Sequence, residues 1–291
     1  MGRFAPSPTG DLHLGSLVAA LGSYLDARRH GGRWLVRMED LDTPRVVPGS
    51  ADRILRTLEA FGLEWDGEVL YQSRHVQRYL AVADELKSRG LTFACACSRR
   101  ELAGTEEAGY PGTCRNGPRG SGPTATRFRV HEEQISVFED RIQGTCRFEL
   151  RALGDFVIRR KDGIVAYQLA VVVDDALQDI TDVVRGADLL ASTSWQIALQ
   201  QALGARTPRY AHLPVVLSAE QDKLAKSRQA VPLDPAFATR TLCVALRLLN
   251  LPPPPELEHG RPAGLLAWAA RSWSVDACRH MRSVRAVTPA A

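Results

Sequence analysis

The chain has no apolar run that approaches the roughly 20 residues needed to cross a bilayer. One strongly apolar stretch, Leu169–Val173, stops abruptly at Asp174 and Asp175. The N-terminal residues MGRFAPSPTG lack the apolar centre of a secretory signal. These absences predict a cytoplasmic protein with no membrane partner.

The net charge is small, and cysteines are few. Lys and Arg number 37 against 33 Asp and Glu, an excess that is compatible with a nucleic-acid partner without indicating one. Hydrophobic residues make up 45% and charged residues 24%, the balance of a globular protein. A reducing cytoplasm disfavours disulfides among the six cysteines. Three of them cluster at Cys95, Cys97 and Cys114, and clustered thiols in such a compartment indicate a metal.

Strand-like and helix-like segments alternate over residues 1–90. The spacing of apolar residues predicts strands over Arg3–Ala5, Trp34–Met38 and Val69–Tyr71, and helices over Leu14–Arg29, Ala51–Phe61 and His75–Lys87. The alternation resumes with the segments Phe156–Arg159, Tyr167–Val173 and Ile180–Arg185, a helix over Leu189–Leu203 and a strand over His212–Leu217. This pattern predicts an α/β fold with a parallel sheet.

The alternation breaks between about residues 91 and 153, where the chain holds the cysteine cluster and the Gly/Pro/Ser-rich segment GTCRNGPRGSGPTAT. We therefore predict a split Rossmann-like sheet whose halves are residues 1–90 and 154–228, with residues 91–153 as a metal-binding insertion. Residues 229–291 are predicted to form a short helical C-terminal region. Its apolar segments Leu242–Leu249 and Leu265–Trp273 are expected to pack back on the core.

Two motifs at opposite ends of this sheet suit a nucleotide. His13, Gly15 and Ser16 lie at the start of the first helix, where backbone N–H groups and the helix dipole favour a phosphate. The glycine would let a nucleotide approach the backbone, and His13 can hydrogen-bond a phosphate oxygen as pyrophosphate leaves. Lys223 and Lys226 lie in a polar loop after a predicted strand and can stabilise growing negative charge. Taken singly, each motif is better explained by the ordinary alternative, a capped helix for the first and a solvated lysine-rich loop for the second.

Together the two motifs resemble the HIGH and KMSKS signatures of class I aminoacyl-tRNA synthetases. Ser16 replaces the second histidine, and Leu224 and Ala225 replace Met and Ser. The segments RFAPSPTG (3–10), RMEDLDTPR (37–45) and VVRGAD (183–188) further resemble glutamyl-tRNA synthetase. The resemblance extends from Arg3 to about Arg228 and implies ATP-dependent formation of an aminoacyl adenylate, with Mg²⁺ accompanying ATP. It implies that His13 and Lys226 are catalytic and that ATP contacts His13, Gly15, Ser16, Lys223 and Lys226.

Glutamate has two carboxylates and one ammonium, and arginine suits planar, bidentate recognition of a carboxylate. The resemblance places Glu39 opposite the α-ammonium, with Tyr167 and Arg185 completing the site. The full set of implied glutamate-binding residues is Arg3, Phe4, Ala5, Pro6, Ser7, Glu39, Tyr167 and Arg185. Considered alone, Glu39 and Arg185 would be a surface ion pair, and Tyr167 a core aromatic residue.

Tetrahedral zinc favours thiolates and takes four groups in a structural site, so the three clustered cysteines need a fourth ligand. Chemistry alone favours His131, because tyrosine coordinates well only when the metal lowers its pKa. The glutamyl-tRNA synthetase-like enzymes that glutamylate queuosine have a C-x-C…Y…C arrangement, and Tyr110 falls where their tyrosine does. This resemblance implies one zinc ion held by Cys95, Cys97, Tyr110 and Cys114. Three free cysteines are the alternative.

The segment after Ser227 is too short for the helical anticodon-binding region of a full-length glutamyl-tRNA synthetase. Together with the cysteine motif, this resembles the glutamyl-Q tRNA(Asp) synthetases. That resemblance implies activation of L-glutamate without tRNA and its transfer to queuosine in the anticodon stem-loop of tRNA(Asp), and we expect a monomer. The alternatives are a truncated glutamyl-tRNA synthetase that charges the 3′ end of tRNA, and a non-catalytic zinc and RNA-binding module. Part of the tRNA contact surface, or else a solvated basic face, is expected at Arg115, Arg119, Arg127 and Arg129.

Overall fold

The computed structural model describes residues 1–98, 100–102, 109–131, 133–217 and 231–286. Lys223 and Lys226, which form one half of the predicted ATP site, lie outside the described residues. Within the described ranges, no helix is both long enough and apolar enough to cross a membrane.

The two predicted halves of the sheet meet at its first strand. β1 (Gly2–Phe4), β2 (Trp34–Met38) and β3 (Leu70–Tyr71) are parallel and pair in the order β1-β2-β3. A second sheet contains the parallel strands β9 (Asp182–Gly186) and β10 (Arg209–Leu213). The backbone N–H groups that precede and begin β9 donate to the Met1 carbonyl, so β9 starts beside β1. β1 therefore has β2 on one side and β9 on the other, which is the arrangement that creates a binding crevice in an open α/β sheet.

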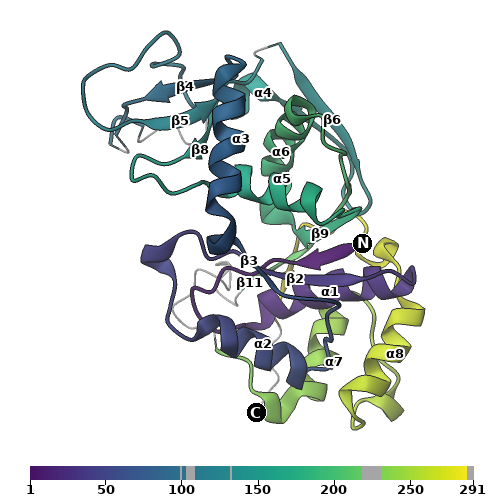
Figure 1. Cartoon of the computed structure of the whole chain (residues 1–291). Helices are drawn as coiled ribbons and strands as arrows, with labels where there is room; N and C mark the ends of the chain where they lie inside the picture. Colours follow the sequence, from purple (N-terminus) through teal and green to yellow (C-terminus); the bar gives the residue numbers. More distant parts are fainter. Residues whose placement is uncertain (99, 103–108, 132, 218–230, 287–291) are drawn as a thin grey trace.

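Helices cover this sheet on the side of the C-terminal region (Figure 1). α1 (Leu14–Arg29) follows β1, and α2 (Ser50–Ala60) follows β2. α7 (Ala238–Leu248) and α8 (Pro262–Ser272) both pack against α1. The leucines that these helices share in one buried core are Leu17, Leu21, Leu25, Leu242, Leu246, Leu265 and Leu266. The C-terminal segments thus pack back on the core as predicted.

A second group of helices lies beyond β3 (Figure 1). α3 (Val76–Ser88) packs against α5 (Tyr167–Leu177), and α5 packs against α6 (Leu190–Leu203). The segment Tyr167–Val173, named above without assignment to a strand or a helix, therefore forms most of α5. Every residue of its segment 169–175 is buried, and a helix that is surrounded by protein has no need of an amphipathic pattern.

The strands of the predicted insertion are divided between two sheets. β4 (Thr92–Cys95), β5 (Ala125–Phe128) and β8 (Phe156–Arg159) form an antiparallel sheet in the order β4-β5-β8. The hairpin of β6 (Ile135–Asp140) and β7 (Gly144–Glu149) instead extends the sheet of β9 and β10. α4 (Leu150–Leu153) follows the hairpin. The pairings of β5 with β8 and of β6 with β10 both join strands from the two sides of position 153. A domain boundary at that position stays a prediction.

The predicted strand over residues 212–217 is interrupted at Pro214, which has no N–H to donate to a ladder. Its second part is β11 (Val215–Leu217), which pairs in parallel with β12 (Ser283–Arg285). Over residues 231–286, the part of the C-terminal region that the structure describes, the chain is therefore helical with one strand that the apolar pattern did not reveal. Short 3-10 helices cover Thr43–Arg45, Gln72–His75, Ala187–Leu189, Pro235–Phe237, Pro255–Leu257 and Val275–Cys278.

Candidate active site

α1 begins at a histidine whose side chain caps the helix through one ring nitrogen and carries an N–H on the other. His13 is the N-cap residue; its Nδ1 accepts the N–H of Ser16 at 3.2 Å, and Ser16 Oγ accepts the N–H of His13 at 2.7 Å. A neutral imidazole that accepts through Nδ1 carries its proton on Nε2. The predicted phosphate motif is thus a capping box that fixes an N–H donor at the positive end of a helix dipole.

A hollow of about 170 Å³ adjoins this helix start. Its walls come from the beginning of α1, from Gly186 at the end of β9 and Asp188 just after it, and from residues 213–216 of the β10–β11 segment. A Cβ on Gly15 would lie 3.1 Å from two atoms of the His13 ring. Gly15 therefore leaves room for the imidazole that caps the helix, in addition to any approach of a nucleotide.

A buried carboxylate bridges two arginines from neighbouring strands. Asp175, near the end of α5, accepts from Nε of Arg3 at 3.2 Å and from a terminal nitrogen of Arg37 at 2.8 Å. Arg3 is 3% exposed and Arg37 is fully buried. Burial alone would raise the pKa of Asp175, but the two guanidinium groups outweigh it and lower that pKa below its ordinary value. Asp175 therefore fixes the direction of the Arg3 guanidinium and balances its positive charge from inside the protein.

Glu39 lies beside this pair with one oxygen unsatisfied. Its Oε1 is buried without a hydrogen-bond partner and lies 3.7 Å from a terminal nitrogen of Arg37. Burial raises the pKa of Glu39 to about 7, against the lowering effect of Arg37 and Arg3. An unsatisfied buried acceptor costs on the order of 1–3 kcal/mol, so a cationic group that donates to Glu39 would relieve that cost.

Arg185, on β9, is held by three side chains that carry no formal charge. Nε donates to Nε2 of His212 at 3.1 Å, and the terminal nitrogens donate to Oγ1 of Thr193 at 2.8 Å and to Oη of Tyr167 at 3.2 Å. Arg185 is only 5% exposed. Nδ1 of His212 in turn donates to a buried carboxylate oxygen of Asp140 at 2.6 Å. The guanidinium is fixed in one plane and in one direction.

The structure brings three of the predicted glutamate-binding side chains, Arg3, Glu39 and Arg185, together around a fourth, Tyr167. Burial raises the pKa of Tyr167, and the charges of Arg185, Glu39 and Arg3 all act on its hydroxyl. The predicted glutamate-binding residues that follow Arg3 in the chain lie in different surroundings from Arg3 itself. Phe4 faces the opposite side of the strand and stacks on Trp34 in the core, whereas the Pro6 carbonyl accepts the N–H of Glu39 at 2.9 Å. Ala5 is half-buried and Ser7 is exposed.

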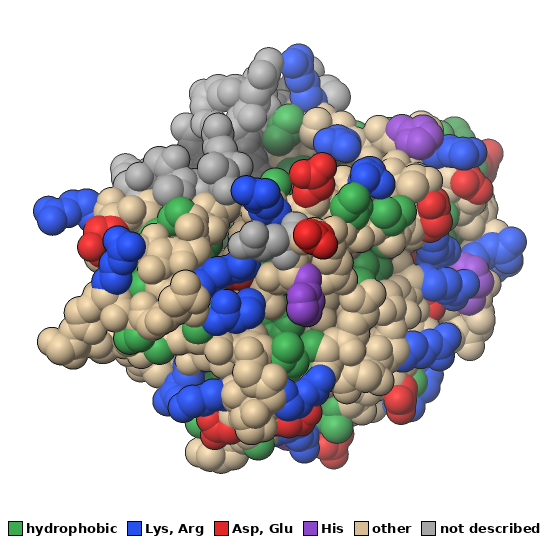
Figure 2. All heavy atoms as spheres, turned by 90° about the horizontal axis from the view of Figure 1, so that it is seen from above, with side chains coloured by type: hydrophobic (Ala, Val, Ile, Leu, Met, Phe, Trp, Pro, Cys, Tyr) green, Lys and Arg blue, Asp and Glu red, His purple; other side chains and the backbone are tan. Residues whose placement is uncertain are grey.

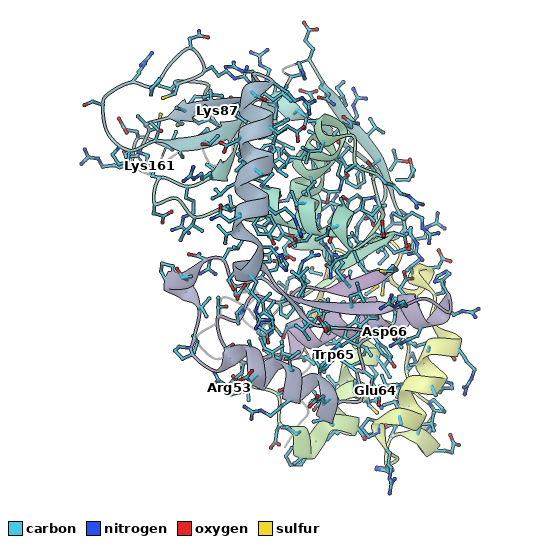
Figure 3. The ribbon with its side chains drawn as sticks, in the orientation of Figure 1. Arg53, Glu64, Trp65, Asp66, Lys87 and Lys161 are labelled. Atoms are coloured by element: carbon cyan, nitrogen blue, oxygen red, sulfur yellow. The ribbon has the colours of Figure 1, made fainter. Side chains whose placement is uncertain are left out.

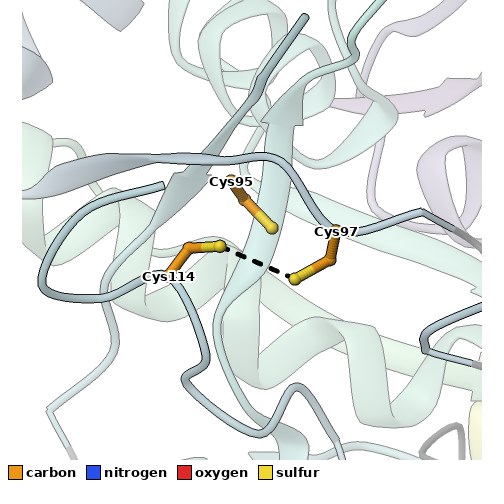
Figure 4. A group of neighbouring side chains, drawn as sticks. All are labelled: Cys95, Cys97 and Cys114. Carbon is orange, nitrogen blue, oxygen red and sulfur yellow. Dashed lines mark hydrogen bonds between the residues drawn. The ribbon is translucent and has the colours of Figure 1, made fainter. Parts of the chain in front are cut away.

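The predicted metal ligands also converge, and Figure 4 shows the three cysteines among them. The sulfur atoms of Cys95, Cys97 and Cys114 lie within 4.8 Å of one another. Oη of Tyr110 lies 3.3 Å from Sγ of Cys95 and 3.8 Å from Sγ of Cys97, and it accepts the N–H of Cys114 at 2.8 Å. His131 is exposed and, among the residues the structure describes, is not part of the cysteine group. Three sulfur atoms and one phenol oxygen at this spacing fit the tetrahedral donor set of zinc.

The backbone prepares one of these thiols for a metal. Burial alone would raise the pKa of Cys114, but the backbone N–H groups of Arg119 and Ala96 and the Tyr110 hydroxyl outweigh it and lower the pKa to about 6. A thiolate is the form that binds a metal. Lys161 donates to the Ala96 carbonyl at 2.6 Å, which ties the segment between Cys95 and Cys97 to the loop after β8 (Figure 3).

Three of the four arginines expected at a tRNA contact surface are engaged within the insertion. Arg115 makes two hydrogen bonds of 2.6 Å to the carboxylate of Asp155. The guanidinium of Arg127 lies 3.9 Å from the centre of the Tyr110 ring, and that of Arg129 donates to the Arg115 carbonyl at 2.7 Å. On the face shown in Figure 2, Lys and Arg side chains are dispersed with Asp and Glu among them. These arginines therefore stabilise the insertion, and only Arg119 is exposed.

Sequence reasoning missed the partners that hold the arginines in place. Asp174 accepts from the Tyr79 hydroxyl at 2.9 Å and from Nε2 of Gln72 at 2.7 Å, while Asp175 bridges two arginines. The signal was present, because two consecutive Asp residues directly after an apolar run must either end it or be buried with cations. His212 also gave a weak signal, as a single histidine in an apolar strand.

Comparison with known proteins agrees with this geometry. The family model of class I tRNA synthetases (E and Q), catalytic domain, matches residues 1–237. The glutamyl-Q tRNA(Asp) synthetase of Ectopseudomonas mendocina is 55% identical over 284 residues, which cover 97% of this chain and 95% of the relative. The protein of the same name from Dechloromonas aromatica is 55% identical over 285 residues, with 95% and 94% covered.

Solved structures show the same fold. A glutamate tRNA ligase from Elizabethkingia meningosepticum, in complex with its amino acid, superposes with a TM-score of 0.79 at 24% identity, over 98% of this chain and 66% of that one. A glutamate-tRNA synthetase from Elizabethkingia anophelis gives 0.77 at 26% identity, over 97% and 67%. The chain therefore spans about two thirds of the length of these structures.

Parallel strands lie on both sides of β1, α1 has a capped start beside them, and buried arginines surround the candidate site. Together with the family match, these features define the catalytic body of a class I aminoacyl-tRNA synthetase. The predicted Rossmann-like α/β fold is thereby confirmed, and use of ATP is implied by the family. Within that class, the chain belongs to the family of the glutamyl-Q tRNA(Asp) synthetases, and it is a ligase.

Proposed function

We propose that the enzyme activates L-glutamate with ATP in the absence of tRNA and transfers it to queuosine in the anticodon loop of tRNA(Asp). The acceptor is supported by the names of relatives that are 55% identical over nearly the whole chain. The amino acid is supported by the cluster around Tyr167, where two arginines and an unsatisfied carboxylate share one buried space. That cluster is the observation on which the proposal chiefly depends.

The three charged groups of glutamate each have a counterpart in this cluster. Oε1 of Glu39 would accept the α-ammonium, which removes the cost of its missing hydrogen bond. Arg185 and Arg3 would receive the two carboxylates, since a guanidinium matches a carboxylate with two parallel bonds. The α-carboxylate of glutamate then attacks the α-phosphorus of ATP, forming a C–O–P link as the bond to the β-phosphate breaks and pyrophosphate leaves.

The hollow beside α1 is the proposed ATP site. Nε2–H of His13, fixed by the capping box with Ser16, would donate to a phosphate oxygen, and the helix N-terminus favours the same anion. Mg²⁺ would accompany the phosphates. Lys223 and Lys226, outside the described residues, are proposed to stabilise the charge that develops on pyrophosphate.

Exchange of labelled pyrophosphate into ATP tests the activation step. The wild-type enzyme should catalyse exchange that requires glutamate and needs no tRNA, with aspartate and glutamine giving little stimulation. Arg185→Ala should mainly raise the KM for glutamate, because it leaves a carboxylate without its bidentate partner. Exchange that appears only after tRNA is added, or that aspartate stimulates equally, would contradict the proposal.

Transfer of labelled glutamate to three tRNA(Asp) samples tests the acceptor. The samples are tRNA with queuosine, the same tRNA without queuosine, and queuosine tRNA from which the 3′-terminal adenosine has been removed. Labelling of the first and third, and not of the second, is expected. Equal labelling of the first two with loss in the third would identify a truncated glutamyl-tRNA synthetase that charges the 3′ end.

We further propose one zinc ion per chain, held by Cys95, Cys97, Tyr110 and Cys114. The proposal is supported by the convergence of these four donor atoms and by the lowered pKa of Cys114. When bound, zinc would supply a structural cross-link between β4 and the loop that follows it. Metal analysis of protein purified without chelators should find close to one zinc per chain, and its absence would contradict the assignment.

A further inference from the structure

Behind the arginine of the proposed glutamate site lies a second, fully buried pair of residues. We propose that Asp140 and His212 act as a positioning pair that sets the direction of the Arg185 guanidinium and thereby the affinity for glutamate. The inference rests on the proposed glutamate site. It adds to that site two residues that need not contact any substrate.

The Asp140 carboxylate is fixed by contacts that differ between its two oxygens. Oδ1 accepts three backbone N–H groups, from Ile142 at 3.0 Å, Gln143 at 2.8 Å and His212 at 3.1 Å. Oδ2 accepts Nδ1–H of the His212 side chain at 2.6 Å. Asp140 ends β6 and His212 lies on the neighbouring strand β10, so the sheet itself holds the pair together. The carboxylate therefore selects the imidazole tautomer with its proton on Nδ1.

That tautomer leaves Nε2 of His212 as an acceptor, which faces Nε of Arg185 at 3.1 Å. Oγ1 of Thr193 lies 3.1 Å from the same imidazole nitrogen and accepts from a terminal nitrogen of Arg185 at 2.8 Å. Two donors on one edge of the guanidinium, Nε and a terminal nitrogen, are thus held by neutral acceptors. If the proton of His212 moved to Nε2, a donor would face the donor of Arg185, and the guanidinium would have to turn away.

The surroundings favour a neutral His212. Burial lowers the pKa of His212, Asp140 raises it, Arg185 lowers it and the charge of Asp188 raises it, with a net fall below the ordinary value. Tyr210, on the same strand, stacks on the ring at 6.1 Å. These are the charged and titratable groups that face the imidazole from β6, β9, the 3-10 helix after β9, and β10. Its acceptor nitrogen therefore persists at neutral pH.

Asp140→Asn tests the tautomer directly. The amide oxygen can keep the three backbone hydrogen bonds of Oδ1, while the amide N–H₂ replaces Oδ2 and faces Nδ1 as a donor. The imidazole must then accept through Nδ1 and carry its proton on Nε2, against Arg185. We expect the KM for glutamate in pyrophosphate exchange to rise about 10- to 100-fold, the effect of a lost hydrogen bond to a charged group, with less than about a threefold change in kcat.

His212→Gln separates positioning from general damage. The amide oxygen of Gln can occupy the place of Nε2 as an acceptor that no longer depends on Asp140. We expect a rise in KM of less than about threefold, and no further rise when Asp140→Asn is added to it. Tyr210→Phe is the matched control, since it removes a buried hydrogen bond of the same strand, from Gln200 at 2.9 Å, and keeps the ring. Its KM for glutamate should stay within about twofold of the wild type.

The outcomes distinguish this inference from the proposed function. If the wild-type enzyme shows no glutamate-dependent exchange, the proposed function fails. If it does and Asp140→Asn leaves the KM unchanged, or if the two single losses multiply in the double variant, the positioning pair is refuted. Should Asp140→Asn not fold, the pH profile decides: acidification lowers the glutamate affinity of both enzymes as Glu39 protonates, and the wild type should lose a further part of that affinity, as His212 protonates, that His212→Gln retains. An identical acid loss in both would overturn the inference.

Discussion

Replacing Asp175 with Asn removes a carboxylate that accepts hydrogen bonds from both Arg3 and Arg37, while it keeps the shape of the side chain. The side chain of Asp175 is 8% exposed, and those of its partners are 4% and 0% exposed, so water cannot replace the lost charge. Breaking a buried ion pair by removing one partner costs about 3–5 kcal/mol. Arg37 keeps Asp174 at 3.8 Å and Glu39 at 3.7 Å. We therefore expect a loss near the lower end, about 3 kcal/mol of unfolding free energy.

Urea denaturation at neutral pH, followed by tryptophan fluorescence, measures this loss as a fall in the midpoint at constant slope. The matched control is Glu85→Gln, which breaks an exposed pair with Arg89 whose side chains are 55% and 44% exposed. Such a pair contributes less than about 0.5 kcal/mol. A loss below about 1 kcal/mol for Asp175→Asn, comparable to the control, would refute the view that this bridge holds β1, β2 and α5 together.

Three further predictions follow from the site. Since the pKa of Glu39 is about 7, glutamate affinity measured by calorimetry should rise between about pH 6 and 8 as the carboxylate ionises, and Glu39→Gln should remove that step. Gly15→Ala should lower the exchange rate at least about tenfold by displacing the His13 ring. Its unfolding free energy should change by less than about 1 kcal/mol, because the helix propensity of Ala offsets the weakened cap. Metal analysis after dialysis against a chelator should show faster zinc loss in Tyr110→Phe and the fastest loss in Cys97→Ser.

The sequence was sufficient for elements whose signal is local. α1 begins and ends as its apolar spacing predicts, because a half-buried helix must repeat that spacing, and β2 matches a short, mostly apolar run that is buried throughout. α5 gave no such signal, since a helix buried on all sides has no polar face to mark its period. The pairing of β11 with β12 joins residues far apart in the chain, and no local pattern predicts such a contact. The convergence of the candidate metal ligands could be predicted because Cys95, Cys97, Tyr110 and Cys114 lie within one short segment, and their binding of a metal stays a prediction.

The contacts that organise the proposed glutamate site are long-range and so were missed. Arg3 and Asp175 are 172 residues apart in the chain, and Arg37 and Asp175 are 138 apart. Motif resemblance could name Arg3 and Arg185 without showing what each is paired with. Only the folded arrangement shows that one is held by a carboxylate and the other by neutral groups.

Because of this difference, Arg3 and Arg185 would contribute unequally to binding a glutamate carboxylate, a division that the sequence left open. The charge of Arg3 is already balanced by Asp175 at 3.2 Å, so a carboxylate that approaches Arg3 also meets that negative charge. Among the described residues, the hydrogen-bond partners of Arg185 are His212, Thr193 and Tyr167, all neutral at pH 7. Its guanidinium therefore has no directly hydrogen-bonded carboxylate among those residues and lies in a buried space, where an ionic attraction is much stronger than in water. We infer that Arg185 supplies most of the attraction for a glutamate carboxylate and that Arg3 chiefly orients it.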